Sequence, residues 1–371
     1  MTTTIDPASP KPVELSAAAG HVRPLAPVQI HSFESRLSDD WQSYVDQHAD
    51  GTLFHGLGWK RAVEQAFGHR SWYLMARQGG RVVGVLPLAE VRSVLAGRLL
   101  VSVPYGTYGG ILGDDVASRR ALFRAAESLA GRIGAKSLQL RSIHAAIPRL
   151  PVQHTHATFR KPLPLAASDV LAAFPRKARA AARRAASRAD LSVEFDGAHL
   201  ATLWRLYARS MRRLASPNYP YRFFDALARA LPGRHVVQIV RSQGRPVAGL
   251  LTLLHGDTVM PYFMGMDERA DIYGLSHYLY LRSLTWGVEH GYRTYDFGRT
   301  RVDNSGPFNF KRFCGFEPTL LEYQTLVMPG KAAPDLSPGS QRWATARRVW
   351  KTLPLSLTRP LGGWLSRSIP G

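Results

Sequence analysis

The feature that most constrains the fold of this chain is an internal repeat. In RQGGRVVGVLPL (77–88), a polar turn containing glycine joins two apolar runs rich in β-branched residues, and RSQGRPVAGLLTL (241–253) has the same pattern. This pattern is typical of a β-hairpin. A further strand is expected after each hairpin, within 99–112 in the first copy and within 258–266 in the second.

Both copies then end in the same way. A helical stretch is followed by a glycine, Gly134 in AESLAGRIGAKSLQL (126–140) and Gly291 in LTWGVEHGYRTYDF (284–297), and then by a strand. A glycine directly after a helix ends it in the left-handed conformation, which other residues disfavour. The order hairpin, strand, helix, glycine, strand therefore occurs twice, about 160 residues apart.

Two descriptions of the fold fit this repeat: two generic α/β domains, or tandem copies of an N-acetyltransferase-like (GNAT-like) fold. We favour the second, an α/β (α+β) protein in which each copy has a mixed sheet flanked by helices, because the whole order of elements agrees. Prolines in RKPLPLAASDV (160–170) break the pattern between the copies. The expected organisation is a flexible tail, two GNAT-like domains of which the second is the catalytic candidate, and a basic amphipathic tail: 1–27, 28–165, 166–330 and 331–371.

Composition limits the class of protein. With 371 residues, 45% of them hydrophobic, the chain can bury a sizeable core. Its single cysteine, Cys314, permits no intrachain disulfide and suits a reducing cytoplasm, and its apolar surroundings indicate packing. The thirteen histidines show no metal-ligand spacing, so no metal is expected. The first 27 residues lack the apolar stretch of a signal peptide, and no apolar run is long enough to span a membrane.

The net charge of +21 favours partners that are polyanions: nucleic acid, anionic lipid or phosphorylated substrates. Much of this charge lies in FPRKARAAARRAASRAD (174–190), where a helix would gather Arg179, Arg183 and Arg184 on one side and alanines on the other. This face is either simply solvated or contacts RNA backbone or another polyanion. Without interleaved aromatic residues, any such contact would carry little sequence information. The expected partners include tRNA and do not include DNA.

Four segments, taken together, resemble the FemAB family and more narrowly its exosortase/PEP-CTERM-associated branch, which is found with exopolysaccharide loci. They are FHGLGWKRAVEQAFGHRSWYLMARQGGRVVGVLPLAEVRS (54–93), FPRKARAAARRAASRADLSVEF (174–195), SMRRLASPNYPYRFFDAL (210–227) and HGYRTYDFGRTRVDNSGPFNFKRFCGFEPTLLEY (290–323). The resemblance implies a cytoplasmic acyl- or aminoacyltransferase that modifies an amine of a cell-envelope, peptidoglycan or exopolysaccharide precursor. A non-catalytic RNA- or membrane-surface-binding protein that kept the GNAT fold is the alternative.

The resemblance also implies site residues. Lys311 in FNFKRF matches the family's F-K lysine, and a fixed cation in a water-poor site would stabilise the oxyanion formed during acyl transfer. The other interpretation is a lysine whose stem packs on phenylalanine while its ammonium reaches solvent. Arg213 matches an arginine that recognises the acceptor, and Tyr262 matches a tyrosine that lines the pocket or simply belongs to the core.

Three further residues complete the expected site. Asp296, at a strand end before Gly298, could accept a proton from the attacking amine or cap the following turn. Arg299 is expected at the mouth of the site, and Phe308 is expected to line it and hold the lysine stem.

The donor and the C-terminal tail leave alternatives open. The segment DERADIYGLSH (267–277) lacks the glycine spacing with which acyl-CoA enzymes of this fold hold pyrophosphate, which favours aminoacyl-tRNA over acyl-CoA and predicts no tightly bound cofactor. In QRWATARRVWKTL (341–353), Trp343, Trp350 and Leu353 share one helical side. This helix would either rest peripherally on the inner face of an anionic membrane or dock on the protein's own domains.

Overall fold

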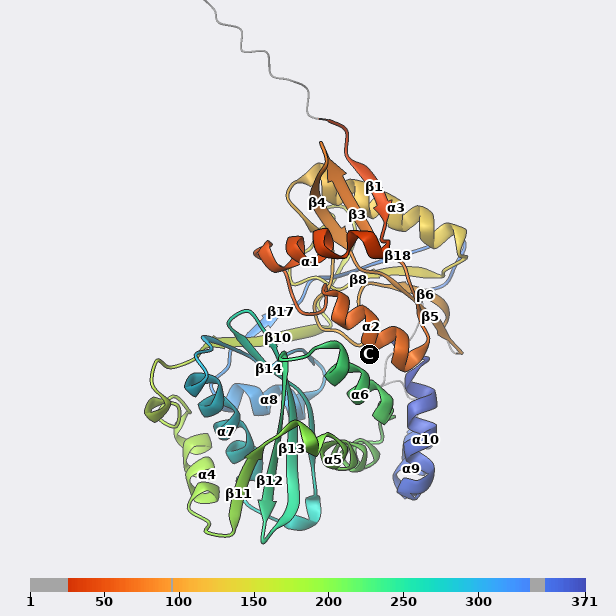
Figure 1. Ribbon diagram of the computed structural model, residues 1–371. Coiled ribbons are helices and arrows are strands. Elements are labelled where there is room, and N and C mark those ends of the chain that lie inside the picture. The colour runs from red at the N-terminus through yellow and green to blue at the C-terminus, as the bar shows by residue number, and fades with distance from the viewer. Residues whose placement is uncertain (1–25, 95, 334–343) are drawn as a thin grey trace, which may run out of the picture.

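The computed structural model describes residues 26–94, 96–333 and 344–371. Most of the expected flexible tail, and Trp343, lie outside these residues. The described chain forms two sheet-and-helix units, one above the other in Figure 1.

The first unit contains two sheets. A four-stranded sheet has the order β1-β3-β4-β7 and comprises β1 (Gln29–Ser32), β3 (Leu74–Gln78), β4 (Arg81–Leu86) and β7 (Leu112–Gly113). A six-stranded sheet has the order β2-β5-β6-β8-β18-β9 and comprises β2 (Arg70–Ser71), β5 (Ala89–Ser93), β6 (Gly97–Val101), β8 (Ser137–Leu140), β18 (Tyr323–Val327) and β9 (Val152–Gln153). Its helices are η1 (Ser35–Leu37), α1 (Ser38–Gln47), α2 (Leu57–Phe67) and α3 (Val116–Arg132).

The second unit is built on one eight-stranded sheet in the order β11-β12-β13-β14-β15-β10-β16, with β17 also paired to β10. Its strands are β10 (His156–Pro162), β11 (Leu191–Phe195), β12 (His235–Ser242), β13 (Arg245–His255), β14 (Thr258–Met266), β15 (Thr294–Asp296), β16 (Thr300–Arg301) and β17 (Pro318–Leu320). The parallel pairing of β14 with β15 makes this sheet mixed.

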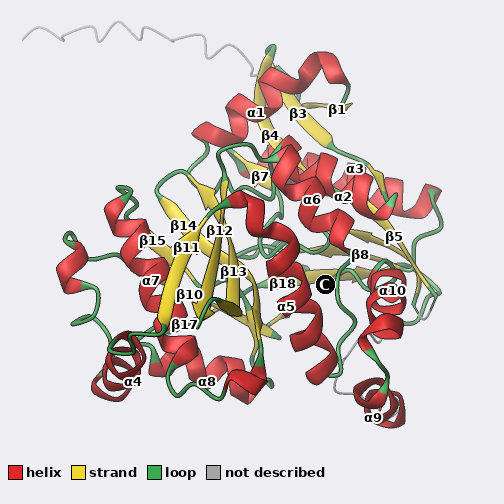
Figure 2. Cartoon of the chain, turned by 60° about the horizontal axis from the view of Figure 1, so that its bottom comes forward, coloured by secondary structure: helices red, strands yellow, loops and turns green. Residues whose placement is uncertain are grey.

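Helices cover both faces of the second sheet. On one face lies α5 (Leu200–Arg213), and α7 (Leu275–Glu289) lies on the other, as Figure 2 shows. The remaining helices are α4 (Arg176–Ala186), α6 (Tyr221–Ala230) and α8 (Ser305–Phe313), with the short turns η2 (Ala167–Asp169), η3 (Gly197–His199) and η4 (Glu268–Ala270). The core between α2, α5, α6 and the sheet joins the two units, because it contains Trp59, Phe223 and Phe263 from both halves of the chain.

The predicted repeat is confirmed. The two hairpins are β3–β4 and β12–β13, and each glycine after a helix has a positive φ, 65° at Gly134 and 79° at Gly291. Strands β8 and β15 follow these glycines, as expected. The sequence pattern did not show that the first unit is divided into two sheets between β4 and β5, with β6 paired in parallel to β8 in the second of them, as β14 is paired to β15.

Two strands cross the expected border near residue 165. Strand β10, from the end of the first copy, pairs with β15, β16 and β17 in the second sheet. Strand β18, which follows the second copy, pairs with β8 and β9 in the first unit. The ranges 28–165 and 166–330 therefore each contain one strand that completes the sheet of the other unit.

The C-terminal tail docks on the protein. Helices α9 (Ala344–Thr352) and α10 (Leu355–Ser366) contact α5. Gly362 is buried so closely against Asn218 that a Cβ atom there would lie 2.4 Å from the Asn218 side chain. The next residues run into the junction between the units, where the backbone N–H of Tyr105 donates to the carbonyl of Pro370 at 2.6 Å. Within the described residues, no helix is both long and apolar enough to span a membrane.

Candidate active site

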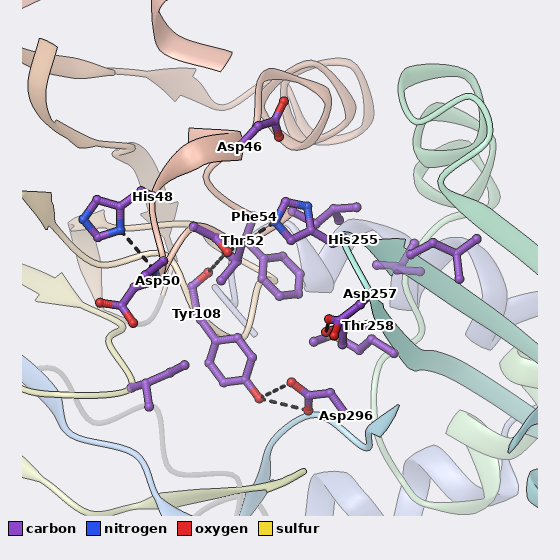
Figure 3. Close-up of a pocket in the computed structure, with 18 of the residues that line it drawn as sticks. Asp46, His48, Asp50, Thr52, Phe54, Tyr108, His255, Asp257, Thr258 and Asp296 are labelled. Atoms are coloured by element: carbon purple, nitrogen blue, oxygen red, sulfur yellow. Dashed lines mark hydrogen bonds between the residues drawn. The ribbon is translucent and has the colours of Figure 1, made fainter. Parts of the chain in front are cut away.

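A cavity of about 280 Å³ lies between the two units. Figure 3 shows the side chains that line it. They come from the loop between α1 and α2, from Tyr108, Ile143 and Arg160, from the β13–β14 hairpin, and from Asp296 at the end of β15. Because neither unit alone supplies all these walls, the cavity exists only when the two units are packed together.

Asp296 is held at this cavity by both units. Its side chain is 1% exposed, and the Tyr108 hydroxyl donates to its two carboxylate oxygens at 3.0 and 2.9 Å. The backbone N–H of Gly298 donates at 2.8 Å, and Arg160 forms an ion pair at 3.4 Å. Burial raises the pKa of Asp296 above its usual value, although Arg160 and these hydrogen bonds oppose the shift. A carboxylate with a raised pKa is a stronger proton acceptor than an ordinary one.

The cavity is acidic in a protein that is strongly basic overall. Arg160 lines the cavity with a positive charge. Four carboxylates also line it: those of Asp46, Asp50, Asp257 and Asp296. His255 also lines it, and burial lowers the pKa of its imidazole, which favours the neutral form. A site with this charge attracts a cation such as a protonated amine.

Lys311 lies behind Asp296 and does not line the cavity. Its ammonium donates to the carbonyl oxygens of Phe297, Gly298 and Arg299 at 2.7, 3.0 and 3.4 Å, and lies 5.1 Å from the centre of the Phe159 ring. These three acceptors account for the three N–H donors of an ammonium. Burial lowers the pKa of Lys311 to about 7, so its charge depends on pH in the neutral range, whereas the sequence analysis expected a fixed cation.

Arg299 and Tyr262 lie together near the cavity. The Arg299 guanidinium donates to the Tyr323 hydroxyl at 3.3 Å, and the Tyr262 hydroxyl donates to the carbonyl of Tyr105. Tyr262 also occupies a β-bulge, because the register of β14 against β13 shifts between Pro261 and Phe263. Bulges often re-aim side chains beside active sites.

The other expected residues lie apart from the cavity. Phe308 on α8 packs edge-on against Phe159, which is beside the Lys311 stem. Arg213 is exposed in the last turn of α5 and lines neither this cavity nor a smaller one of about 60 Å³ beside it. Cys314 is buried in the core, where burial raises the pKa of its thiol to about 12. Among the described residues, no group of three His, Cys, Asp or Glu could hold a metal ion.

The arginine helix α4 forms as expected, with Ala178, Ala182 and Ala185 buried. Arg183 and Arg184 are exposed, whereas Arg179 is half-buried and donates to the carbonyl of Ala172 at 3.4 Å. Figures 1 and 2 both place α4 at the far end of the second unit from the first unit.

The N-terminus of α7, where an acyl-CoA pyrophosphate would be held in this fold, is closely packed. Gly274, with φ of 79°, precedes α7, and a Cβ atom there would lie 2.2 Å from the carbonyl oxygen of Ala181 on α4. Helix α4 therefore lies against this turn, which also lacks a glycine-rich loop. The residues present do not fit a pyrophosphate at this position.

Sequence reasoning found Asp296 but missed most of the groups around it. Tyr108 lies within 99–112, where the sequence analysis expected a strand, and Arg160 lies in the segment expected to separate the copies. Asp46 lies in the last turn of α1, Asp50 and Asp257 lie in turns, and none of the three carries a local pattern. Their common signal is spatial, since they converge from separate parts of the chain.

Comparisons with known proteins define the fold. The family model described as "Acetyltransferase (GNAT) domain" matches residues 172–312. The crystal structure of FemX superposes with a TM-score of 0.63 at 15% identity, covering 81% of this chain and 97% of that chain. A tandem GNAT protein from the clavulanic acid biosynthesis pathway gives 0.55 at 15% identity, covering 82% and 100%.

A third similar structure is the C-terminal domain of a protein from Agrobacterium fabrum assigned as a lysylphosphatidylglycerol synthetase. Its TM-score is 0.53 at 13% identity, with 79% of this chain and 92% of that chain covered. No curated protein sequence matches the chain. The chain thus has the tandem GNAT fold, and the match to the GNAT acetyltransferase model lies within its second unit.

Proposed function

We propose that the chain is an acyl- or aminoacyltransferase that acylates an amine, and that the acidic cavity between its two units binds the acceptor amine. The observation that carries this proposal is Asp296, a buried carboxylate with a raised pKa at the wall of a cavity lined by three further aspartates. The GNAT domain match supports the reaction class.

The proposed chemistry uses Asp296 as the general base. A protonated acceptor amine transfers a proton to the Asp296 carboxylate, and its nitrogen then forms a bond to the acyl carbon of the donor. The bond from that carbon to the donor oxygen or sulfur breaks, and the leaving group takes up the proton held by Asp296, while the second proton of the former ammonium leaves the nitrogen for solvent as the amide forms. Tyr108, which donates to both carboxylate oxygens, holds Asp296 in orientation.

Lys311 acts on this site as a positioning residue in the proposal. Its ammonium holds the carbonyls of the loop 297–299, which directly follows Asp296, and the Asp296 charge in turn favours the protonated lysine. In the proposal, the positive charge of Lys311 stabilises the oxyanion of the reaction in two ways. It orders the loop 297–299, and it attracts the negative oxygen electrostatically. Phe308 and Phe159 keep the lysine stem away from water.

For the substrates, we propose an amine of a cell-envelope saccharide or peptidoglycan precursor as the acceptor. The FemAB resemblance and the fold shared with FemX support this class. Aminoacyl-tRNA is the proposed donor, because the α7 N-terminus does not fit the pyrophosphate of acyl-CoA. An association with exopolysaccharide and PEP-CTERM systems, and a cytoplasmic location, belong to the same proposal.

We also propose that α10 contacts an anionic membrane surface. Three apolar residues at i, i+4 and i+7 share one exposed side of this helix: Leu357, Leu361 and Trp364, which are 49%, 43% and 62% exposed. The neighbouring Arg348, Lys351 and Arg367 are exposed cations, and such a combination suits an interface rich in anionic lipid. Loss of vesicle binding in Leu361→Glu with Trp364→Glu would support this contact, and unchanged binding would exclude it.

The transfer reaction is tested with purified protein, aminoacyl-tRNA or acyl-CoA as donor, and amine-bearing envelope precursors as acceptors, with the acylated product measured by mass spectrometry. We expect Asp296→Asn to lower the rate at least about 100-fold, the scale of general-base catalysis. Asp303→Asn is the matched control, because Asp303 pairs with Arg301 at the surface. Full turnover by Asp296→Asn would remove this residue from the mechanism.

The alternative, a binding protein without catalysis, is favoured by the exposed arginines on α4. Such a protein would bind uncharged and aminoacylated tRNA equally and would form no acylated product with any acceptor.

A further inference from the structure

The loop between β6 and β7, residues 102–111, has a backbone conformation that its residues disfavour. Val103 and Tyr105 have φ of 46° and 65°, in the left-handed region that residues other than glycine rarely adopt. Both side chains are buried, at 1% and 3% exposed. A disfavoured conformation persists only where the surrounding contacts hold it, and such conformations cluster at active sites. The contacts that hold this loop therefore bear on the site beside it.

This loop carries Tyr108, whose hydroxyl donates to both carboxylate oxygens of Asp296 (Figure 3). The Val103 side chain lies against the backbone on both sides of Tyr108. A Cβ atom at Gly106 would lie 3.1 Å from a methyl carbon of Val103, and one at Gly109 would lie 2.1 Å from the same carbon. The path of the chain around Val103 thus fixes the place from which Tyr108 reaches Asp296.

Tyr105 connects this loop to α10. Its ring stacks on Phe67, with the ring centres 4.1 Å apart. Its hydroxyl lies 2.7 Å from Nε2 of His69 and donates to the carbonyl of Ser366, the last residue of α10, at 3.2 Å. The last carbonyls of a helix have no partner within the helix, so the Tyr105 hydroxyl satisfies one that α10 leaves open. Because Ser366 is only 2% exposed, water does not replace this contact.

The docking of α10 is fixed at Gly362, one turn before Ser366. A Cβ atom at Gly362 would lie 2.4 Å from the side-chain oxygen of Asn218 and 2.8 Å from its backbone nitrogen. The Asn218 side chain also donates to a backbone carbonyl of α10 at 3.2 Å. The next residue, Tyr219, packs edge-on against the Tyr105 ring, with centres 5.4 Å apart. Helix α10 therefore contacts Tyr105 directly through Ser366 and indirectly through Asn218 and Tyr219.

The backbone of Tyr105 faces the second unit. Its carbonyl accepts from the Tyr262 hydroxyl. The Tyr262 ring in turn packs against Phe54, with centres 5.6 Å apart, and Phe54 lines the acidic cavity. Tyr105 thus contacts α10 with its hydroxyl and a neighbour of the cavity wall with its carbonyl, three residues before Tyr108.

We propose that Tyr105 is a positioning residue that couples the docking of α10 to the loop that carries Tyr108. When α10 is docked, Ser366 holds the Tyr105 hydroxyl, the loop keeps its disfavoured conformation, and Tyr108 keeps both hydrogen bonds to Asp296. When α10 is displaced, the loop relaxes and Asp296 loses the hydroxyl that orients it. The effect on catalysis rests on the proposed function, whereas the position of Tyr108 is measured without turnover.

The test follows the Tyr108 ring by fluorine NMR in the whole chain labelled with fluorotyrosine. The Tyr108 signal is identified by its absence in Tyr108→Phe. Tyr105→Phe removes one hydroxyl and keeps the stacked ring, and Gly362→Ala pushes α10 away from its contact. We expect each of these two variants to shift or broaden the Tyr108 signal. Gly131→Ala in α3 is the control, because a Cβ atom there meets only the end of Met328, at 3.8 Å. An unchanged Tyr108 signal in either variant would overturn the proposal.

Turnover gives the second measurement. We expect Tyr105→Phe and Gly362→Ala each to lower kcat at least about tenfold, because small displacements of a catalytic group slow a reaction steeply. Since both variants act through one contact, the double variant should lose no more than the larger single loss. Losses that multiply would show that α10 and Tyr105 act independently, and would overturn the coupling. A changed Tyr108 signal in a protein that transfers no acyl group would reject the proposed function and support the positioning role.

Discussion

The two units have the same order of elements but use it differently. In the second unit, β13 and β14 pair along their length within one continuous sheet, whereas the first unit is divided between β4 and β5, which belong to different sheets. The second unit supplies Asp296 from the strand end after its glycine. At the corresponding strand end of the first unit, Gln139 binds Arg141 instead. One copy therefore presents a carboxylate and the other presents loops that enclose it.

This difference shows how a duplicated fold can make one site. The first unit contributes Asp46 at the end of α1, the loop 48–54, Tyr108 and Ile143 to the cavity, while the second contributes strand ends and a hairpin. Loops diverge more freely than strands, because they carry few of the core contacts. Each of the following changes tests how far the two units differ or depend on each other.

Separating the units should have the largest effect. If 28–165 and 166–330 are expressed as separate proteins, each loses its exchanged strand, β18 from the first unit and β10 from the second. We expect neither fragment to give a cooperative thermal transition or a dispersed NMR spectrum. Insertion of a short Gly/Ser linker after Gly330, which lies in open space, is the control and should be tolerated. A cooperative transition in either fragment would show that this unit folds without the strand that the other fragment contains.

The second largest effect is expected at the equivalent glycines of the two hairpins, Gly84 and Gly249, whose replacement by alanine should cost different amounts of stability. A Cβ atom at Gly84 would lie 2.9 Å from the backbone carbonyl oxygen of Leu112, which cannot easily move. At Gly249 the nearest atoms are the ends of the Ile239 and Leu203 side chains, also at 2.9 Å. We expect Gly84→Ala to lower the free energy of unfolding by about 2 kcal/mol and Gly249→Ala by less than about 1 kcal/mol. Equal losses in denaturant titrations would show that the first unit is as adaptable as the second.

Lys311 offers a pH test of the second unit. Its pKa is about 7 in the folded protein and 10.5 in the unfolded chain, so the unfolded chain holds more protons between these values. Stability therefore rises with pH from about 7 to 10, by at most about 1.4 kcal/mol per pH unit for this residue. Lys311→Met lacks this pH dependence. The difference in the free energy of unfolding between the wild type and this variant should therefore grow across that pH range. A constant difference would mean that the lysine is not desolvated.

The smallest expected effect concerns surface charge. We expect the double variant Arg183→Glu and Arg184→Glu on α4 to elute from heparin at lower salt, with a stability change within about 0.5 kcal/mol. The control is Arg120→Glu with Arg124→Glu, which changes two exposed arginines on α3 of the first unit. Equal shifts in elution for both pairs would show that net charge, and not the α4 face, binds the polyanion.

Much of the fold could be predicted from the sequence because its signals are local. Turn glycines, hairpin patterns and the helix-ending residues Gly134 and Gly291 act within a few residues of themselves. The strand exchange could not be predicted, since β10 and β18 are short strands of mixed polarity whose partners lie far away in sequence. The same holds for the site: Asp296 marks a strand end, but the charge of Lys311 depends on burial that only the packed structure provides.

The exchange of β18 has a consequence for how the protein is made. During synthesis the first unit stays incomplete, because β8 pairs with β18, and β18 is synthesised only after the whole second unit. An uncovered sheet edge invites pairing with other chains. The half that is translated first is thus completed last, and we expect chains that end between β8 and β18 to be prone to aggregate.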